Sequence, residues 1–349
     1  MPVPFGKKVD ISRVLGELAE RNRCPISAMV DVTWRCNFHC RHCYRARRTG
    51  RELSARRWEG VFDELASAGV LLLTFSGGEP LVRKDFFRIA RAARERRFSL
   101  KLKTNAHLLT PGAADFLRDT GFEQVQVSFY SLRPGEHDFI TGVRGSHERL
   151  MSALRLLKDR GIDVHLSMPV MNINVGEIPR MVDFALKEGF EYTVDPSLTI
   201  CDDGSCSPAR LRAIPADIAV IFCDPRLLSR RAYRRAVRLR RRKPGEVVCN
   251  VGKSSVVIDP SGDVRPCAMI PVVIGNLTRQ GLREIWETSE FLGFLKGVTW
   301  RDLHGCSECD LRPWCVRCHG SALIEDGDLL GPSRIACGVA MARKLAVEY

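Results

Sequence analysis

Long hydrophobic runs are absent from this sequence. Apolar stretches such as Val70–Leu73 are far shorter than the roughly 18 residues that suggest a membrane span. Met1–Asp10 also lacks the charged segment followed by an apolar one that marks a secretory signal. We therefore expect a cytoplasmic protein that does not bind a membrane.

Strong compositional bias is absent as well. The 349 residues are 45% hydrophobic and 27% charged, close to the averages for folded globular proteins. No low-complexity segment or solenoid repeat is visible. This length predicts one large domain and a smaller one.

Acidic residues are missing from one segment, and this explains the basic character of the whole chain. Nine arginines and Lys243 lie within residues 226–243, so these ten charges leave only +3 of the formal +13 for the rest. The run is either a solvated surface helix or an electrostatic site for an acidic peptide or partner. Nucleic acid is not expected, because no recognition motif or pattern of stacking aromatic residues accompanies the charge.

A βα alternation extends from Ala28 to about Asp195 and predicts a parallel sheet covered by helices. Ser54 and the pair Thr110–Pro111 are typical helix starts. Gly69, Gly121, Gly161 and Gly189 each follow a helical pattern, where glycine can take the left-handed conformation. The six predicted strands are Ala28–Trp34, Val70–Phe75, Ser99–Lys103, Gln124–Phe129, Asp163–Met168 and Glu191–Val194.

After Asp195 the sequence becomes rich in turns and cysteines. Asp259–Gly262 has the chemistry of a hairpin turn, and Ile335–Val347 has a helical pattern. We predict four segments: an N-terminal extension at 1–25, a βα core at 26–196, a linker with a basic helix at 197–245, and a cysteine-rich domain at 246–349.

Fourteen cysteines without an export signal point to metal ligation, because a reducing cytosol disfavours disulfides. Cys36, Cys40 and Cys43 supply three thiolates directly after the first predicted strand. On spacing alone, a zinc knuckle and an iron–sulfur cluster with one open iron are both possible.

Gly77-Gly78-Glu79-Pro80 follows the second strand. Glycine there would let the backbone approach a ligand closely, and a carboxylate could accept from an ammonium group. Together with the Cys-x3-Cys-x2-Cys segment and the aromatic Tyr44, this element resembles the radical S-adenosylmethionine (radical SAM) superfamily. The resemblance implies a partial (β/α)6 barrel of TIM type. It also implies a [4Fe–4S] cluster on Cys36, Cys40 and Cys43, whose open iron binds the cofactor and whose electron cleaves it to a 5′-deoxyadenosyl radical.

Further segments fit the same family. Thr104-Asn105-Ala106 resembles its Thr-Asn-Gly, with Ala106 as a departure. The resemblance implies that Gly77, Gly78 and Glu79 hold the methionine amine, and that Thr104, Asn105, Ser128, Arg144 and Tyr44 also contact the cofactor. From the residues alone, Ser128 could equally be a strand-end cap and Arg144 a solvated loop residue.

The C-terminal cysteines resemble the SPASM extension of radical SAM enzymes, which binds two auxiliary iron–sulfur clusters. The quartet Cys306-x2-Cys309-x5-Cys315-x2-Cys318 has a last gap of two residues where the family usually has three. The resemblance implies one cluster on Cys249, Cys267 and Cys318, and another on Cys306, Cys309, Cys315 and Cys337. The alternative is a pair of zinc ribbons.

The first auxiliary cluster lacks a fourth cysteine in this scheme. We expect an open iron or a non-cysteine ligand there, and assign Cys201, Cys206 and Cys223 as buried or loop thiols. Cys24 is expected to be structural. Auxiliary clusters suit a net oxidation, because the substrate radical must lose a second electron.

These motifs leave the substrate open. Peptide maturation is our first expectation, with a separate leader-binding protein or the basic run presenting the peptide, and with a flavodoxin or ferredoxin as electron donor. Haem-pathway and carbohydrate-dehydrogenating enzymes are alternatives. Sulfatase activation is disfavoured because Ala268 replaces the aspartate that follows this cysteine in those enzymes. A non-catalytic zinc or iron–sulfur module is the alternative from another class.

Several polar residues near the sheet remain open to interpretation. His137-Asp138 is expected to stabilise the loop after the fourth strand, and His39 and His42 to shape the surroundings of the cluster. Asp195 and the Asp202-Asp203-Gly204 loop are candidates for substrate contact.

Overall fold

The computed structural model describes Gly16, Leu18, Ala19 and Arg21, and residues 24–46, 48–227 and 243–348. Most of the basic run at 226–243, and most of the N-terminal extension predicted at 1–25, lie outside the described residues. Their predicted roles stay predictions.

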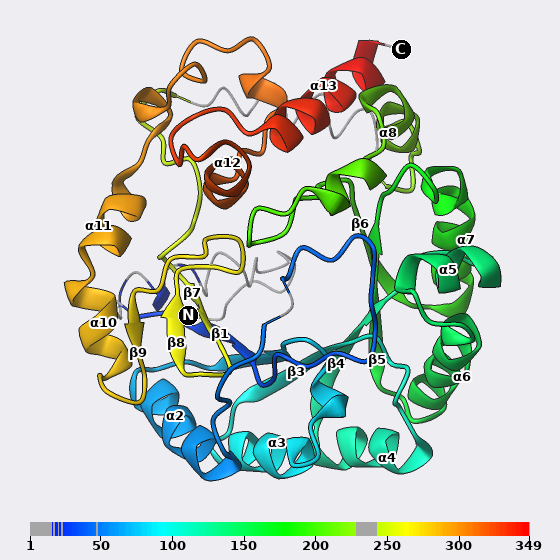
Figure 1. The fold of residues 1–349 in the computed structure, drawn as a ribbon, viewed down its shortest axis with the longest axis vertical. Helices are drawn as coiled ribbons and strands as arrows, with labels where there is room; N and C mark the ends of the chain where they lie inside the picture. Colours follow the sequence, from blue (N-terminus) through cyan, green and yellow to red (C-terminus); the bar gives the residue numbers. More distant parts are fainter. Residues whose placement is uncertain are drawn as a thin grey trace, which may run out of the picture.

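One sheet organises the described chain (Figure 1). Its strand order is β6-β5-β4-β3-β2-β1-β7-β8-β9, and β1 to β6 are parallel neighbours in sequence order. These six confirm the predicted parallel sheet. Their bounds are Ser27–Asp31 (β1), Leu72–Ser76 (β2), Ser99–Thr104 (β3), Phe122–Ser128 (β4), Asp163–Pro169 (β5) and Glu191–Asp195 (β6).

The first strand ends three residues before its predicted end. Beyond Asp31, the side chain of Thr33 and the backbone nitrogen of Trp34 donate to Glu52 at 2.7 and 2.9 Å. Glu52, which lies outside the sheet, therefore fixes the segment directly after β1.

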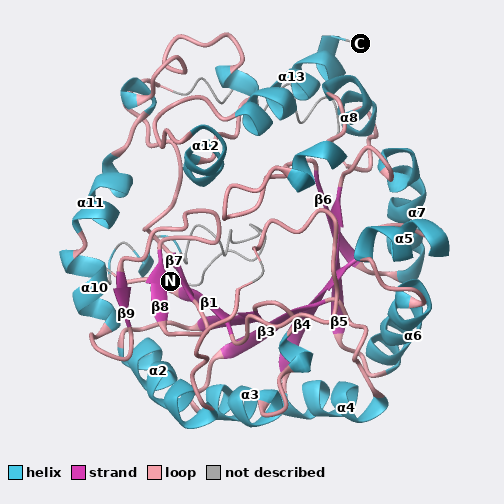
Figure 2. Cartoon of the chain, viewed as in Figure 1, coloured by secondary structure: helices cyan, strands magenta, loops and turns pink. Residues whose placement is uncertain are grey.

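Helices cover the outer face of the parallel strands (Figure 2). Alternate strand residues such as Leu73 and Phe75 point outward into the main hydrophobic core, where they join Trp58 and Phe62. The helices of this layer are Ala55–Ser67 (α2), Phe86–Glu95 (α3), Pro111–Thr120 (α4), Pro134–Thr141 (α5), Ser146–Asp159 (α6) and Ile178–Glu188 (α7).

The predicted helix signals are confirmed. Ser54 accepts from the backbone nitrogen of Arg57 at 3.3 Å, and Thr110 accepts from that of Ala113 at 3.2 Å. These caps satisfy backbone donors that have no partner inside the helix. The four glycines at predicted helix ends, Gly69, Gly121, Gly161 and Gly189, all have positive φ.

His137 and Asp138 lie on α5, and not in a loop as predicted. The Asp138 carboxylate accepts from the backbone nitrogens of Gly145 at 2.6 Å and His147 at 3.0 Å. It therefore caps the start of α6. Asp138 thus has the expected stabilising role, but it lies on α5 and stabilises the turn that follows this helix.

The predicted hairpin forms and joins the main sheet. Ser255–Ile258 (β7) pairs in parallel with β1, and Asp263–Arg265 (β8) and Gly275–Asn276 (β9) continue the sheet with antiparallel pairing. The sequence pattern predicts the turn but not this pairing, because β1 and β7 lie more than 200 residues apart. The pairing continues the βα sheet into the C-terminal region.

The remaining helices lie beyond this hairpin, apart from α8, which follows β6. They are Pro215–Phe222 (α8), Leu282–Thr288 (α10), Glu290–Gly297 (α11), His319–Asp326 (α12) and Arg334–Glu348 (α13). The last confirms the predicted terminal helix, and it packs on α8 through Ala342 and Ala346 against Ile218 and Ala219 (Figure 1). Among the described residues, no helix combines the length and apolar character needed to cross a bilayer.

Candidate functional site

The loop carrying Cys36, Cys40 and Cys43 crosses the inner side of the sheet after β1 (Figure 1). On one side, the backbone nitrogens of His39 and Arg41 donate to the carbonyls of Thr141 and Ile140, both at 3.0 Å. The end of α5 thus fixes the middle of the loop.

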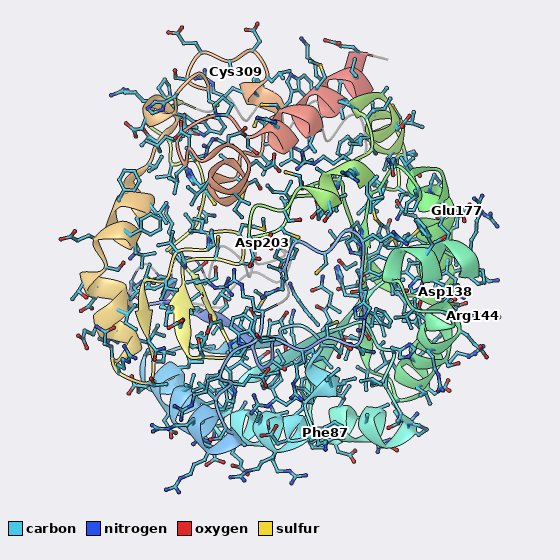
Figure 3. The ribbon with its side chains drawn as sticks, viewed as in Figure 1. Phe87, Asp138, Arg144, Glu177, Asp203 and Cys309 are labelled. Carbon is cyan, nitrogen blue, oxygen red and sulfur yellow. The ribbon has the colours of Figure 1, made fainter. Side chains whose placement is uncertain are left out.

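The Asp202 loop holds the other end of the cysteine segment. The Asp202 carboxylate accepts from the backbone nitrogen of Ala46 at 2.8 Å and from the Arg48 side chain at 3.0 Å. The backbone nitrogen of Asp202 donates to the Tyr44 carbonyl at 2.8 Å, and the Cys201 thiol donates to the Cys43 carbonyl at 3.1 Å. Asp202 is therefore committed to positioning the loop, whereas Asp203 is exposed and lies near the middle of the molecule (Figure 3).

Gly77 and Gly78 fit against this same loop. A Cβ at Gly77 would lie 2.6 Å from the Thr33 carbonyl oxygen, and one at Gly78 would lie 2.2 Å from that of Arg35. The backbone nitrogens of Gly78 and Glu79 donate to these same two carbonyls at 2.8 and 2.9 Å. Among the described residues, both glycines therefore approach protein backbone closely. The sequence analysis had explained the need for glycine at these positions by a close approach to a ligand.

The Glu79 carboxylate joins the segment after β2 to the end of β3. It is buried, and it accepts from the Thr104 hydroxyl at 2.8 Å and from the backbone nitrogens of Asn105 and Leu81 at 2.7 and 3.0 Å. Burial raises the pKa of Glu79 to about 7, although these three hydrogen bonds oppose the shift. Glu79 thus unites the Gly-Gly-Glu element with the end of β3.

Asn105 carries the connection on to the cysteines. Its side-chain nitrogen lies 2.9 Å from the Asn37 side-chain oxygen and 3.9 Å from the Cys36 sulfur. The next residue, Ala106, has a φ of 59°, a left-handed conformation that costs a non-glycine residue roughly 1–2 kcal/mol. This explains why the resembling family has glycine at that position.

Tyr130 is a site residue that the sequence analysis missed. Its buried phenol is hydrogen-bonded to the side chains of Cys40 and Ser128, and burial followed by the Cys40 charge raises its pKa. The ring also meets His42 with centroids 4.6 Å apart. Tyr130 lies two residues after Ser128, in a segment that the sequence analysis singled out for Ser128 alone.

Two of the predicted cofactor contacts have little structural support. Arg144 is exposed on the turn between α5 and α6 and lies on the outer side of the molecule in Figure 3. Tyr44 is half-buried beside Arg45, whose guanidinium carbon lies 5.5 Å from the ring centroid. Their roles toward the cofactor stay predictions.

The thiols of the first cysteine triplet influence one another's ionisation. Burial, followed by the negative charges of Cys43 and Cys36, raises the pKa of the Cys40 thiol to about 12. Thiolates this close are stable together only around a cationic centre. Among the described residues, no three His, Cys, Asp or Glu side chains are grouped around a single ion position.

The C-terminal cysteines fall into two groups. Burial raises the pKa of Cys267 to about 11, with Cys318 and Cys249 adding to the shift. These three are the predicted ligands of the first auxiliary cluster, and Cys249 and Cys267 pack on one apolar cluster.

The second group is separate from the first. Burial raises the pKa of Cys337, and the charges of Cys306 and Cys309 raise it further. Cys306 and Cys315 pack on a different apolar cluster, formed around Trp300. These interactions relate Cys337 to Cys306 and Cys309, and Cys267 to Cys318 and Cys249. The assignment of the seven cysteines to two clusters stays a prediction.

Arg317 lies between these two groups and was not singled out from the sequence. Its buried guanidinium is hydrogen-bonded to Cys306 and interacts with the charges of Cys318 and Cys315. It also donates to the carbonyls of Leu329 and Gly331. The sequence feature that could have identified Arg317 is its position between Cys315 and Cys318.

The other cysteines lie elsewhere. Cys24 is buried in the main core, as expected, and Cys206 is exposed. The Cys223 thiol donates to the Ala346 carbonyl at 3.7 Å, and Cys201 contacts the first cysteine loop. Neither contact is with the auxiliary cysteine groups.

Comparison with known protein families agrees with this geometry. The model of the radical SAM superfamily matches residues 30–185, and that of the SPASM iron–sulfur cluster-binding domain matches residues 249–310. The chain has a radical SAM domain followed by a SPASM domain. It is a radical SAM enzyme, with a [4Fe–4S] cluster, S-adenosylmethionine and auxiliary iron–sulfur clusters as its cofactors.

Curated relatives are similar along almost their whole length. The AdoMet-dependent heme synthase of Methanosarcina barkeri is 28% identical over 325 residues, which are 86% of this chain and 93% of the relative. The PqqA peptide cyclase of Granulibacter bethesdensis is 26% identical over 342 residues, covering 93% of this chain and 90% of the cyclase.

Solved structures show the same radical SAM fold. SuiB of Streptococcus suis bound to S-adenosylmethionine has a TM-score of 0.70 at 16% identity, covering 93% of this chain and 81% of SuiB. The structure of anSMEcpe with bound AdoMet and the Cp18Cys peptide has a TM-score of 0.68 at 18% identity, covering 93% and 96% of the two chains.

Proposed function

We propose that this enzyme modifies a ribosomally made peptide, by taking a hydrogen atom from a side chain or α-carbon and forming a crosslink. The similarity to PqqA peptide cyclases over about nine-tenths of both chains supports this substrate class. The fold shared with SuiB, which has been solved bound to its precursor peptide SuiA, is compatible with it.

The continuous contact from Glu79 through Asn105 to Cys36 carries the proposal. Cys36, Cys40 and Cys43 would hold the cluster, and Gly77, Gly78, Glu79, Thr104, Asn105, Ser128, Arg144 and Tyr44 would surround the cofactor. Bound there, the cluster and S-adenosylmethionine supply a 5′-deoxyadenosyl radical for hydrogen abstraction.

The chain's own residues would orient these groups. Glu79 fixes the end of β3 against the Gly-Gly-Glu turn, and Asn105 reaches from there to the cysteine loop. Tyr130 is hydrogen-bonded to Cys40, and the position of its hydroxyl next to a ligand sulfur is one way in which a protein adjusts a cluster.

The C-terminal cysteines would serve the oxidising half of the reaction. We assign one auxiliary cluster to Cys249, Cys267 and Cys318, and a second to Cys306, Cys309, Cys315 and Cys337. Both would accept electrons after hydrogen abstraction. The segment boundaries that accompany this division are 26–196 for the core, 197–245 for the linker and 246–349 for the SPASM domain.

An open sheet suits a peptide substrate. The strand order ends with β6 at one edge and β9 at the other, and the described strands do not close into a full barrel. The inner face therefore has an open side through which a chain segment could enter. We further propose a cytoplasmic location, a flavodoxin or ferredoxin as electron donor, and a separate leader-binding protein.

A haem-pathway reaction is the second candidate, because the heme synthase of Methanosarcina barkeri is similar over 93% of its length. Sulfatase activation is less well supported, since Ala268 follows Cys267 where those enzymes have an aspartate.

Co-expression with a short precursor encoded beside the gene tests the peptide proposal. We expect the peptide to lose two hydrogen atoms by mass spectrometry, and the Cys36→Ala enzyme to leave it unchanged. An unmodified precursor together with conversion of an iron–porphyrin precursor would favour the second candidate.

A further inference from the structure

Charged side chains form a row on the inner face of the sheet. Asp31 pairs with Ser76 across β1 and β2, and Phe75 pairs with Leu102 across β2 and β3, so Lys103 continues the row from Ser76. Because side chains alternate along a strand, Asp31 and Lys103 both point away from the helix-covered face that holds Phe75 and Leu102.

A third charge enters the row from the C-terminal hairpin. Met29 of β1 pairs with Val257 of β7, which pairs with Arg265 of β8, so the Arg265 side chain lies on this same face. Its guanidinium reaches Asp31, with a nitrogen–oxygen distance of 3.4 Å. The pairing of β7 with β1 thus brings a basic residue of the SPASM region into the radical SAM domain.

Arg45 completes the group from the cysteine loop. Its two terminal nitrogens lie 2.6 and 3.0 Å from the two carboxylate oxygens of Asp31, which is completely buried. Asp31 is therefore paired to two guanidinium groups and positions both.

Positive charge exceeds negative charge in this group. Arg45, Lys103 and Arg265 surround the single carboxylate of Asp31, and within the described ranges the Lys103 ammonium has no hydrogen bond or ion pair. The buried Nε of Arg265 likewise has no hydrogen-bond partner among the described residues. A buried guanidinium nitrogen without a hydrogen-bond partner is costly, and together with the unpaired positive charge of Lys103 it favours a bound anion.

The surroundings of Lys103 are consistent with this shortage of negative charge. Enclosure by protein, followed by the nearby Arg45 charge, lowers the pKa of Lys103, and Asp31 offsets the shift only in part. The side chain is nevertheless open to solvent on the inner side of the sheet. A ligand could therefore reach it.

We propose that Arg45, Lys103 and Arg265 form the binding site for a carboxylate of the substrate. Guanidinium groups bind carboxylates through paired hydrogen bonds, and an ammonium adds a compact charge. Lys103 directly precedes Thr104 and Arg45 follows Cys43 by two positions, so the bound carboxylate would lie beside the radical site. This inference rests on the proposed function, and for a peptide the carboxylate is that of an Asp or Glu side chain or of the C-terminus.

The methionyl carboxylate of S-adenosylmethionine is the other carboxylate that this site could bind. We assign the site to the substrate because three cations and a positioning aspartate converge on the inner face of the sheet, apart from the contacts of Glu79, Thr104 and Asn105. Simultaneous binding of cofactor and carboxylate separates the two sources.

Saturation-transfer NMR on the reconstituted holoenzyme, with propionate as the probe and propionamide as its neutral counterpart, tests the site. We expect propionate to bind and propionamide not to bind. The affinity for propionate should be the same with and without S-adenosylmethionine. Lys103→Met should weaken propionate binding by about tenfold or more, without changing the affinity for S-adenosylmethionine.

Lys101→Met is the matched control. Lys101 lies on the same strand and face as Lys103, but its ammonium contacts Gln124 at 3.4 Å. Propionate binding should therefore survive the Lys101 substitution.

Displacement of propionate by S-adenosylmethionine, or weaker cofactor binding by Lys103→Met, would overturn the assignment to substrate. Equal propionate binding by wild type and Lys103→Met, or none by wild type, would overturn the site itself. Formation of 5′-deoxyadenosine by the same preparation shows independently whether the proposed radical function holds.

Discussion

Asp202 accepts a hydrogen bond from the backbone nitrogen of Ala46 at 2.8 Å, across 156 positions of sequence. With the Arg48 ion pair at 3.0 Å, this contact ties the segment after the cysteine triplet to the loop beyond β6. A cluster held by a single loop needs such fixing, because its three ligands must keep one geometry.

Asp202→Ala should loosen the first cysteine loop. Hydrogen bonds to a charged group contribute about 1.5–3 kcal/mol each, so we expect less iron retained at this cluster, measured by iron analysis and by the EPR signal of the reduced protein. Asp203→Ala is the control, because the Asp203 side chain is exposed and accepts only a local bond from Ser205. Equal iron retention by both variants would show that Asp202 has no such role.

Gly78→Ala should disturb the same loop from its other side. The new Cβ would lie 2.2 Å from the Arg35 carbonyl oxygen, and overpacking of this kind typically costs about 1–3 kcal/mol. Urea unfolding should show lower stability for this variant. Gly60→Ala, in the middle of α2 with nothing within 4 Å, should instead be stabilised by up to about 1 kcal/mol.

Glu79 should make stability depend on pH. Burial raises its pKa from 4.5 to about 7, so the folded state binds an extra proton between these values. The resulting stabilisation is present below the lower value and is lost as pH rises through the upper one, a change on the order of 3 kcal/mol.

Glu79→Gln should remove this pH dependence, because the amide does not titrate in that range. Unfolding free energies of the two proteins, measured in the same form at about pH 5 and about pH 8, test this. Glu59→Gln on the surface of α2 should behave as wild type. A Glu79→Gln profile that still falls with pH would contradict the assignment to Glu79.

Local signals in the sequence predicted much of the fold. Strand alternation, the Ser54 and Thr110 caps and the glycines at helix ends depend only on neighbouring residues, and the structure bears them out. The cysteine triplet and the Gly-Gly-Glu-Pro element predicted the radical SAM domain for the same reason.

Long-range relationships escaped the sequence analysis. The pairing of β7 with β1 and the approach of Asp202 to Ala46 join distant segments, and no local periodicity encodes them. Gly78 was recognised by its motif, but its reason, contact with the Arg35 carbonyl, required the fold. Arg317 lay within a recognised motif, yet only the structure places it between two cysteine groups.

Arg317→Met should lower the reduction potentials of the auxiliary clusters. A buried cation near thiolate ligands favours the reduced and more negative state of a cluster, and Arg317 interacts with Cys306, Cys315 and Cys318. EPR-monitored redox titration of fully iron-loaded protein measures this shift.

Two variants check the origin of that effect. Arg317→Lys keeps the charge and should restore most of the potential, and Arg301→Met removes an exposed arginine and should leave it unchanged. An Arg317→Met protein with wild-type potentials at full iron content would refute the role.

Formation of 5′-deoxyadenosine tests the central assignment most directly. Anaerobically reconstituted wild-type protein, given reductant and S-adenosylmethionine, should release it, and Cys36→Ala should abolish it while the C-terminal cysteines still bind iron. Retained cleavage by Cys36→Ala, or a wild-type protein that contains zinc without sulfide and forms no 5′-deoxyadenosine, would contradict the account.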